Sequence, residues 1–321
     1  ESAPGFVNYP PDDDLYQGNQ WSQQAQNHVL AEADVILVID SDVPWIPAVS
    51  RPNANAAIYH IDVDPLKPWA RLWHIGARRS FAADALTALR QMNARLDRIS
   101  IATAAVAERI AHYAARHRAR AAALMEGERA GEVITPEFLT ACLRRQIPDD
   151  AIVLNEGITN YAVIADHIGR RDPGTLYTSG GSSLGWHGGA AIGVKLAAPQ
   201  RTVVALTGDG SYLFSVPSTV HWMARRYRTP FLQVIYDNRG WKAPKFSTLA
   251  VHPDGYASRA ADIGVAFDPP PDYAAIAAAA GGAYARIVRR PDEVEAAIAE
   301  GLRVVREERR AAVLDVWLPP L

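Results

Sequence analysis

The stretch Leu206–Ser215, LTGDGSYLFS, places a carboxylate between two glycines directly after an apolar run. Gly208 and Gly210 allow the backbone to turn tightly and to come close to a ligand. The backbone N–H groups of Gly210 and Ser211 then stand at the start of the next predicted helix, where anions bind well. Asp209 would repel an anion there unless a cation lay between them. The pattern therefore predicts a site for a metal ion and a phosphorylated ligand.

Magnesium is the cation that suits this combination of groups. Mg²⁺ takes about six oxygen ligands and commonly bridges carboxylates and phosphates. Asp209 would give one ligand, the side-chain oxygen of Asn238 a second, and the backbone carbonyl of Gly240 a third. We expect diphosphate oxygens and water to complete the octahedron.

Alternating strand and helix patterns supply the frame for these residues. Short apolar runs in the second half of the chain predict buried parallel strands at 151–156, 175–179, 202–208, 231–238, 283–288 and 312–318. In an open, doubly wound α/β sheet, ligands bind at the carboxyl ends of the strands. Polar or glycine-rich segments stand at such ends at 155–159, 180–189, 207–211 and 237–241. We therefore expect these segments to form the floor of one site for an anionic ligand.

The first half of the chain predicts a smaller unit of the same α/β class. Apolar runs predict parallel strands at 33–41 and 57–64. Helical patterns flank these strands at 22–33 and 81–96. An Ala- and Arg-rich stretch, 101–130, is interpreted as a helical linker or, equally, as an ordinary surface helix. Thr135 then suits an N-cap and Pro136 the first helical position, so a second domain begins there.

Composition argues against several functional classes. The 321 residues include 33 Lys and Arg against 35 Asp and Glu, so neither nucleic acid nor an acidic membrane is an expected partner. No apolar run reaches the roughly 18 residues of a membrane span. Cys142 is the only cysteine, which rules out an internal disulfide and fits a cytoplasmic location. The first residue is Glu1 rather than Met, and we expect the sequence to be a piece of a longer chain.

Four separated segments resemble one known family. GDGS (208–211) and DNRGW (237–241) resemble the cofactor signature of thiamine-diphosphate enzymes, in which a GDG precedes a metal-binding Asn. YTSGGSSLGWHGGAAIGVKLA (177–197) resembles the loop and helix before that signature in the acetolactate synthase and benzoylformate decarboxylase family. AIVLNEGITNY (151–161) resembles that family's first strand end, and IYHIDVDP (58–65) its central domain. The resemblance implies a thiamine-diphosphate-binding fold of doubly wound parallel sheets with a partial Rossmann-like middle domain.

The resemblance also implies a domain order and a missing part. It places part of the middle domain at 1–98, a helical linker at 99–132, and the diphosphate- and magnesium-binding domain at 133–321. The family's activating glutamate belongs to a pyrimidine-binding domain, which we expect outside this chain, with the site completed in a homodimer or homotetramer. Glu156 is a possible substitute, but its place on the diphosphate side argues against that role. FAD is left open for the middle domain, although a structural role is favoured for Asp62 and Asp64.

Site residues follow from the resemblance position by position. The metal ligands it implies are Asp209, Asn238 and the Gly240 carbonyl, and the cofactor contacts are Asn155, Thr159, Ser182, Leu184, Gly208, Gly210, Ser211 and Trp241. Leu184 matches the bulky residue that supports the bent cofactor. His187 is interpreted as a residue that reaches the substrate or, with more support, as one that satisfies backbone groups. Lys242 and Phe246 are further candidates for the pocket wall.

The implied activity is a thiamine-diphosphate- and Mg²⁺-dependent reaction of a 2-oxo acid, in which CO₂ is lost. Ligation to a second carbonyl compound makes such an enzyme a carboligase, and protonation makes it a decarboxylase. We favour an acetolactate synthase-like carboligase, because HIDVDP (60–65) resembles that enzyme. A benzoylformate decarboxylase type is the alternative, because LNEGITNY (154–161) resembles that enzyme more. A nicotinamide-binding domain is disfavoured because GDGSYL lacks the last glycine of G-x-G-x-x-G. A non-catalytic, cofactor-binding homologue or fragment stays open.

Overall fold

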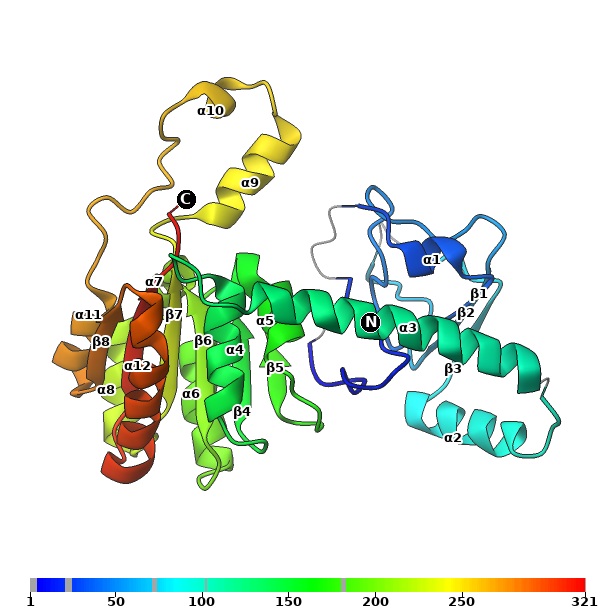
Figure 1. Ribbon diagram of the computed structural model, residues 1–321, viewed down its shortest axis with the longest axis horizontal. Helices are drawn as coiled ribbons and strands as arrows, with labels where there is room; N and C mark the ends of the chain where they lie inside the picture. Colours follow the sequence, from blue (N-terminus) through cyan, green and yellow to red (C-terminus); the bar gives the residue numbers. More distant parts are fainter. Residues whose placement is uncertain (1–4, 21–24, 71–73, 102, 180–182, 321) are drawn as a thin grey trace. The chain divides into compact units, whose positions relative to one another are not determined.

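The computed structural model of the chain describes residues 5–20, 25–70, 74–101, 103–179 and 183–320 (Figure 1). They divide into two compact units, one with Asp13–Arg120 and the other with Gly5–Asp12 and Ala121–Leu321. The division falls within helix α3 (Thr103–Gly127), in the segment predicted to be a helical linker. Across the described ranges, no helix has the length and apolar character needed to cross a membrane.

The larger unit is built on a fully parallel sheet with the strand order β5-β4-β6-β7-β9-β8. The strands are β4 (Ile152–Glu156), β5 (Leu176–Thr178), β6 (Val203–Gly208), β7 (Leu232–Asp237), β8 (Tyr284–Val288) and β9 (Ala312–Trp317). Each lies within a predicted apolar run, so the doubly wound α/β class is confirmed. The chain moves from β4 outward to β5 and then across to β6, which makes the β4–β6 boundary the switch point where such sheets bind ligands.

Helices cover both faces of this sheet (Figure 1). One face carries α4 (Pro136–Gln146), α5 (Tyr161–His167) and α12 (Pro291–Arg303), and the other carries α6 (Trp186–Ala197), α8 (Pro217–Tyr227) and α11 (Tyr273–Gly281). The connecting elements are η1 (Ile158–Asn160), α7 (Asp209–Phe214), α9 (Lys242–Val251), α10 (Tyr256–Arg259) and η2 (Val304–Glu308). Helix α4 begins as predicted, because the Thr135 side chain accepts the N–H of Phe138 and Pro136 follows it.

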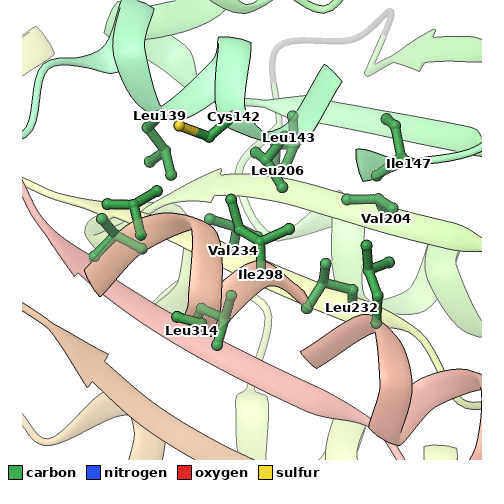
Figure 2. Close-up of a cluster of buried hydrophobic side chains, with 14 of the residues drawn as sticks. Leu139, Cys142, Leu143, Ile147, Val204, Leu206, Leu232, Val234, Ile298 and Leu314 are labelled. Atoms are coloured by element: carbon green, nitrogen blue, oxygen red, sulfur yellow. The ribbon is translucent and has the colours of Figure 1, made fainter. Parts of the chain in front are cut away.

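Alternate residues of the central strands fill two different cores. Val204, Leu206, Val234 and Leu314 join the cluster that includes Leu143 of α4 and Ile298 of α12 (Figure 2). Their neighbours along the strands, such as Val203 and Ala205, pack with α6 and α8 instead. Because both faces are buried, these strands are near-continuous apolar runs in the sequence.

The smaller unit holds a parallel sheet of three strands in the order β1-β2-β3. Its elements are α1 (His28–Glu32), β1 (Val35–Ile39), β2 (Ala57–Asp62), β3 (Arg79–Ala82) and α2 (Ala85–Leu96). The helix predicted from residue 81 was wrong at its start, because Phe81 lies in β3 and Asp84 caps α2 by accepting the N–H of Thr87. Strand β3 was missed because its four residues are all exposed and give no apolar run. Of the helix predicted over 22–33, only His28–Glu32 is helical as α1. Residues 25–27 are not helical, because Asn27 caps the helix, and residues 21–24 lie outside the described ranges.

A buried polar network crosses the core beneath α8. His221 is 1% exposed, its Nε2 lies 3.1 Å from the Tyr212 hydroxyl, and that hydroxyl donates to the Tyr273 carbonyl at 3.2 Å. The His221 ring also stacks on Phe231, with 5.9 Å between centroids. Burial, and after it the charge of His187, lowers the pKa of His221 to about 4. The histidine is therefore neutral in the folded protein near neutral pH.

The first prediction concerns the core between the sheet and α12. Leu314→Ala should lower the free energy of unfolding by about 3 kcal/mol, because it leaves a cavity in a fully buried cluster. Urea denaturation would measure the change. Leu196→Ala, at a position 56% exposed on α6, is the matched control and should change the value by less than about 0.5 kcal/mol. Equal effects of the two substitutions would contradict the assignment of this core.

The second prediction concerns the pH dependence that His221 produces. Since its folded-state pKa of about 4 lies below the unfolded value of 6.5, the unfolded chain binds the proton first as pH falls. The stability linked to His221 is complete above pH 6.5 and should be lost, by roughly 3 kcal/mol, as pH falls toward 4. His221→Gln should remove this part of the slope in denaturation curves measured from pH 7 to 4. His252→Gln, at an exposed histidine, should keep it, and an unchanged slope in His221→Gln would refute the prediction.

Candidate cofactor site

The segments predicted to form the site follow adjacent strands of the larger sheet. Strands β5, β4, β6 and β7 are neighbours in that order, and all are parallel, so their carboxyl ends lie along one edge. The sheet order therefore brings together the segments that follow β4, β6 and β7 and the part of the β5 segment that is described. Ser182, one of the predicted cofactor contacts, lies outside the described residues.

Asp209 joins the ends of β6 and β7. It is the first residue of α7 and is only 2% exposed. Its Oδ1 accepts the N–H of Gly210 and its Oδ2 accepts the N–H of Gly240, each at 2.8 Å. Burial, and after it the neighbouring Asp237 carboxyl, raises the pKa of Asp209 to about 7. A cation beside this carboxylate would oppose both causes of the shift.

The loop after β7 adds further oxygen atoms beside this contact. Asn238 is 5% exposed, and its side-chain Oδ1 has no hydrogen-bond partner in the described part of the chain. The Gly240 carbonyl accepts the N–H of Lys242 at 3.0 Å and keeps a second lone pair. Arg239, between them, has a φ of 61°, a left-handed backbone conformation that is unusual for this residue type. Such backbone strain clusters at ligand sites.

These groups fit magnesium. In the part of the chain that is described, no group of three or more His, Cys, Asp and Glu side chains is placed to hold a metal. The donors would instead be one carboxylate, one amide oxygen and one carbonyl, from Asp209, Asn238 and Gly240. Hard oxygen ligands of this kind suit Mg²⁺, which commonly keeps positions for water and substrate phosphates.

Two further carboxyl groups are buried: Asp237, which lies in the predicted segment 237–241 but had no assigned role, and Asp315, which was missed in the sequence. Asp237 is fully buried at the end of β7, and Asp315 is 1% exposed within β9. Asp237 Oδ1 accepts the N–H of Arg239 at 2.8 Å, whereas Asp237 Oδ2 and Asp315 Oδ1 have no hydrogen-bond partner among the described residues. Burial, and after it Asp237, raises the pKa of Asp315 to about 8. The signal for Asp315 was an acidic residue inside the apolar run AVLDVW.

Trp241 covers Gly210. A Cβ at position 210 would clash with the six-membered ring of the indole, so the contact requires glycine. The indole also makes edge-to-face contacts with Phe214 and Phe267, at centroid distances of 5.5 and 5.0 Å. Ser211, the next residue of α7, is buried. The predicted contacts Gly208, Gly210, Ser211 and Trp241 thus lie on or against the turn from β6 into α7.

The predicted contacts after β4 have different surroundings. Asn155 is fully buried, its Nδ2 donates to the Tyr161 carbonyl at 3.2 Å, and its Oδ1 accepts the N–H of Gly157 at 3.1 Å. Its side chain therefore shapes its own turn. Thr159, in η1, and Leu184, before α6, are both half-buried.

Glu156 and His187 form a buried pair. Both side chains are almost wholly inaccessible, and His187 Nδ1 lies 2.8 Å from Glu156 Oε2. Glu156 also accepts the N–H of His187 at 2.7 Å and the N–H of Gly185 at 2.5 Å. Because both oxygens of Glu156 are directed to these donors, the geometry supports the argument against it as the activating acid. His187 was interpreted as a residue that satisfies backbone groups. It is buried, but its side chain pairs with the Glu156 carboxylate rather than with a backbone group.

The remaining candidate residues lie on other elements. The Lys242 ammonium stands 5.5 Å from the ring centroid of Phe246, which is 54% exposed. In the smaller unit, Asp62 accepts from Lys67 Nζ at 2.7 Å and from the N–H of Asp64 at 2.8 Å. These bonds give Asp62 the structural role that the sequence favoured.

Comparisons with known proteins show what the chain is similar to. Residues 157–316 match the family model described as thiamine pyrophosphate enzyme, C-terminal TPP binding domain. Benzoylformate decarboxylase of Pseudomonas aeruginosa is 31% identical over 108 residues, which are 34% of this chain and 20% of that protein. The acetolactate synthase isozyme 3 large subunit of Escherichia coli is 28% identical over 298 residues, which are 88% of this chain and 48% of that protein.

A solved structure is similar to this chain in fold. A thiamine diphosphate-dependent 4-hydroxybenzoylformate decarboxylase from Rhodococcus jostii RHA1 superposes with a TM-score of 0.74 at 19% identity, covering 100% of this chain and 55% of that one. The chain thus spans about half the length of the relatives that it matches over most of its own length. The matched domain and the curated relatives show that the chain belongs to the thiamine pyrophosphate enzymes related to acetolactate synthase and benzoylformate decarboxylase.

Proposed function

We propose that this chain binds thiamine diphosphate through Mg²⁺ held by Asp209, Asn238 and the Gly240 carbonyl, as part of an enzyme that acts on 2-oxo acids. The observation that carries the proposal is the buried Asp209 carboxylate, which accepts the N–H of Gly240 in the loop where Asn238 Oδ1 has no partner among the described residues. Both lie at the carboxyl edge of the sheet, beside the switch point between β4 and β6. The matched family model, which includes these positions, supports the choice of cofactor.

The chain's own groups would bind and orient this cofactor. The proposed contacts are those that the sequence indicated, namely Asn155, Thr159, Ser182, Leu184, Gly208, Gly210, Ser211 and Trp241. When bound, thiamine diphosphate supplies the nucleophilic and electron-accepting chemistry that decarboxylates a 2-oxo acid. The aromatic group of Phe214, Trp241 and Phe267 would keep water away from the turn at Gly210.

The activating acid is proposed to come from outside these 321 residues. Glu156 directs its oxygens to Gly185 and His187, within its own unit. A pyrimidine-binding domain, contributed in a homodimer or homotetramer, would supply the glutamate and complete the site. The assignment of 1–98 to a middle domain, of 99–132 to a linker and of 133–321 to the diphosphate domain is part of the same proposal. The cytoplasmic location stays a prediction.

We favour carboligation over simple decarboxylation. The acetolactate synthase isozyme 3 large subunit of Escherichia coli and the probable acetolactate synthase 2 of Oryza sativa align with 88% and 98% of this chain, although a probable 2-ketoarginine decarboxylase of Pseudomonas aeruginosa also aligns with 89% of it. Decarboxylation is the second candidate, because benzoylformate decarboxylase has the higher identity, 31%, over a shorter region. The residues at the site do not select between a proton and a second carbonyl compound, so the products must decide.

The third prediction tests the metal. Asp209→Ala should weaken Mg²⁺-dependent binding of thiamine diphosphate at least a hundredfold, on the order of 3 kcal/mol, because it removes the only carboxylate among the proposed ligands. Isothermal titration calorimetry on the 321-residue chain would measure the affinity with and without Mg²⁺. Asp150→Ala, at an exposed position before the amino end of β4, should leave the affinity unchanged. An unchanged affinity of Asp209→Ala for thiamine diphosphate with Mg²⁺ would contradict the assignment of Asp209 as a metal ligand.

The fourth prediction tests the reaction. The complete enzyme, with its pyrimidine-binding domain, should convert pyruvate into an acetolactate-type ligation product, detected by mass spectrometry or a colorimetric assay. The 321-residue chain alone should bind the cofactor but release no CO₂ from pyruvate or benzoylformate. Free benzaldehyde from benzoylformate, with no ligation product from either acid, would overturn the preference for carboligation. Turnover by the isolated chain would disprove the external activating acid.

A further inference from the structure

Glu156 holds the start of α6 from the end of β4. A fully buried carboxylate is strongly unfavourable unless hydrogen-bond donors surround it. Glu156 has three, the N–H groups of Gly185 and His187 and the Nδ1 of His187. The two backbone groups belong to the first turn of α6, where a helix leaves its N–H groups unpaired and its dipole favours a negative charge. The position of this turn therefore depends directly on one carboxylate.

The same turn also lies against the end of α7. Gly185 has a φ of 86°, in the left-handed region that favours glycine. A Cβ at this position would lie 2.5 Å from the carbonyl carbon and oxygen of Phe214, the last residue of α7. The Gly185 backbone consequently lies against the end of α7. The turn is therefore held by the hydrogen bond to Glu156 and lies in close contact with α7.

His187 connects the same carboxylate to α7 through its ring. The imidazole stacks on Tyr212, with 6.4 Å between centroids and 19° between planes. Tyr212 belongs to the same short helix as Asp209, and its hydroxyl is fixed by the Tyr273 carbonyl and by His221. Because these two bonds anchor Tyr212 without help from His187, α7 gives the imidazole a fixed surface.

We infer that Glu156 and His187 are positioning residues, which hold the turn that carries Leu184 in register with the helix that begins at Asp209. The inference rests on the proposed function, in which Leu184 supports the organic part of the cofactor and Asp209 holds its metal. Without the pair, the Leu184 turn is free to leave its place beside α7, while Asp209 and Asn238 keep theirs. The pair thus acts on the fit of the thiamine moiety and leaves the binding of the diphosphate and metal intact.

The test compares two ligands on one variant. Glu156→Gln keeps the size of the side chain but replaces one acceptor oxygen by an NH₂ group, which faces an N–H donor. It should weaken the binding of thiamine diphosphate with Mg²⁺ at least tenfold and leave the binding of inorganic diphosphate with Mg²⁺ within threefold. Calorimetry on the 321-residue chain gives both affinities, and thermal melting gives the stability of each variant. Unchanged affinity for thiamine diphosphate, or an equal loss for both ligands, would overturn the inference.

A second glutamate–histidine pair, with a buried histidine and a partly exposed glutamate, provides the matched control. Glu128 accepts from His167 Nδ1 at 2.8 Å, the same distance as in the Glu156–His187 pair, and lies in the same unit. It also pairs with Arg144, at 2.7 Å. Glu128→Gln should lower the melting temperature and leave both affinities unchanged. If Glu128→Gln weakened thiamine diphosphate binding as much as Glu156→Gln, the effect would be general destabilisation and the inference would be wrong.

A variant of His187 covers the case in which Glu156→Gln does not fold. His187→Asn keeps an N–H donor near the position of Nδ1 and removes the ring that stacks on Tyr212. It should weaken thiamine diphosphate binding at least threefold, again without loss of diphosphate binding, and equal affinity to the wild type would refute the role of the ring. Failure of the wild-type chain to bind thiamine diphosphate with Mg²⁺ would instead refute the proposed function, so the two failures are distinguishable.

Discussion

The Asp209 carboxylate, buried at the junction of two parallel strands, is the constraint on which the site depends. Its oxygens hold the backbone of its own turn and of the loop after β7, so one side chain fixes the distance between the ends of β6 and β7. The carboxyl groups of Asp237 and Asp315 lie nearby, and burial raises the pKa of Asp209 and of Asp315. A cation bound beside these carboxyl groups would favour their ionised forms. Gly210 follows Asp209 directly, and the left-handed Arg239 precedes Gly240, whose N–H donates to Asp209.

At the carboxyl edge of the sheet, the helices position short turns. The α6 turn lies between Glu156 of β4 and the end of α7, and Gly185 is the residue that allows the close approach. The aromatic side chain of Trp241 lies on Gly210 of the α7 turn. Since parallel strands bring these turns to one edge, segments far apart in the sequence form one site. The core beneath is packed on both faces of the sheet, which limits how far any of these turns can shift.

Much of the fold was predictable because its signals are local. Strands buried on both faces give continuous apolar runs, and α4 has an N-cap at Thr135 followed by Pro136. The sequence also predicted the turn at Asp209, since a carboxylate between glycines after a strand is a specific pattern. Strand β3 gave no signal because its residues are exposed. The Glu156–His187 pair and the Asp237–Asp315 group depend on the packing of distant segments, and no spacing in the sequence shows which buried acid meets which donor.

The most direct test of the account is to locate the metal itself. A crystal structure of the 321-residue chain with thiamine diphosphate and Mn²⁺ in place of Mg²⁺ would reveal the ion by its anomalous scattering. We expect one anomalous peak in contact with an Asp209 carboxylate oxygen, Asn238 Oδ1 and the Gly240 carbonyl, with diphosphate oxygens as its other ligands. Thiamine diphosphate bound to the chain with the ion at another place, or with no ion at Asp209, would contradict the proposed metal site.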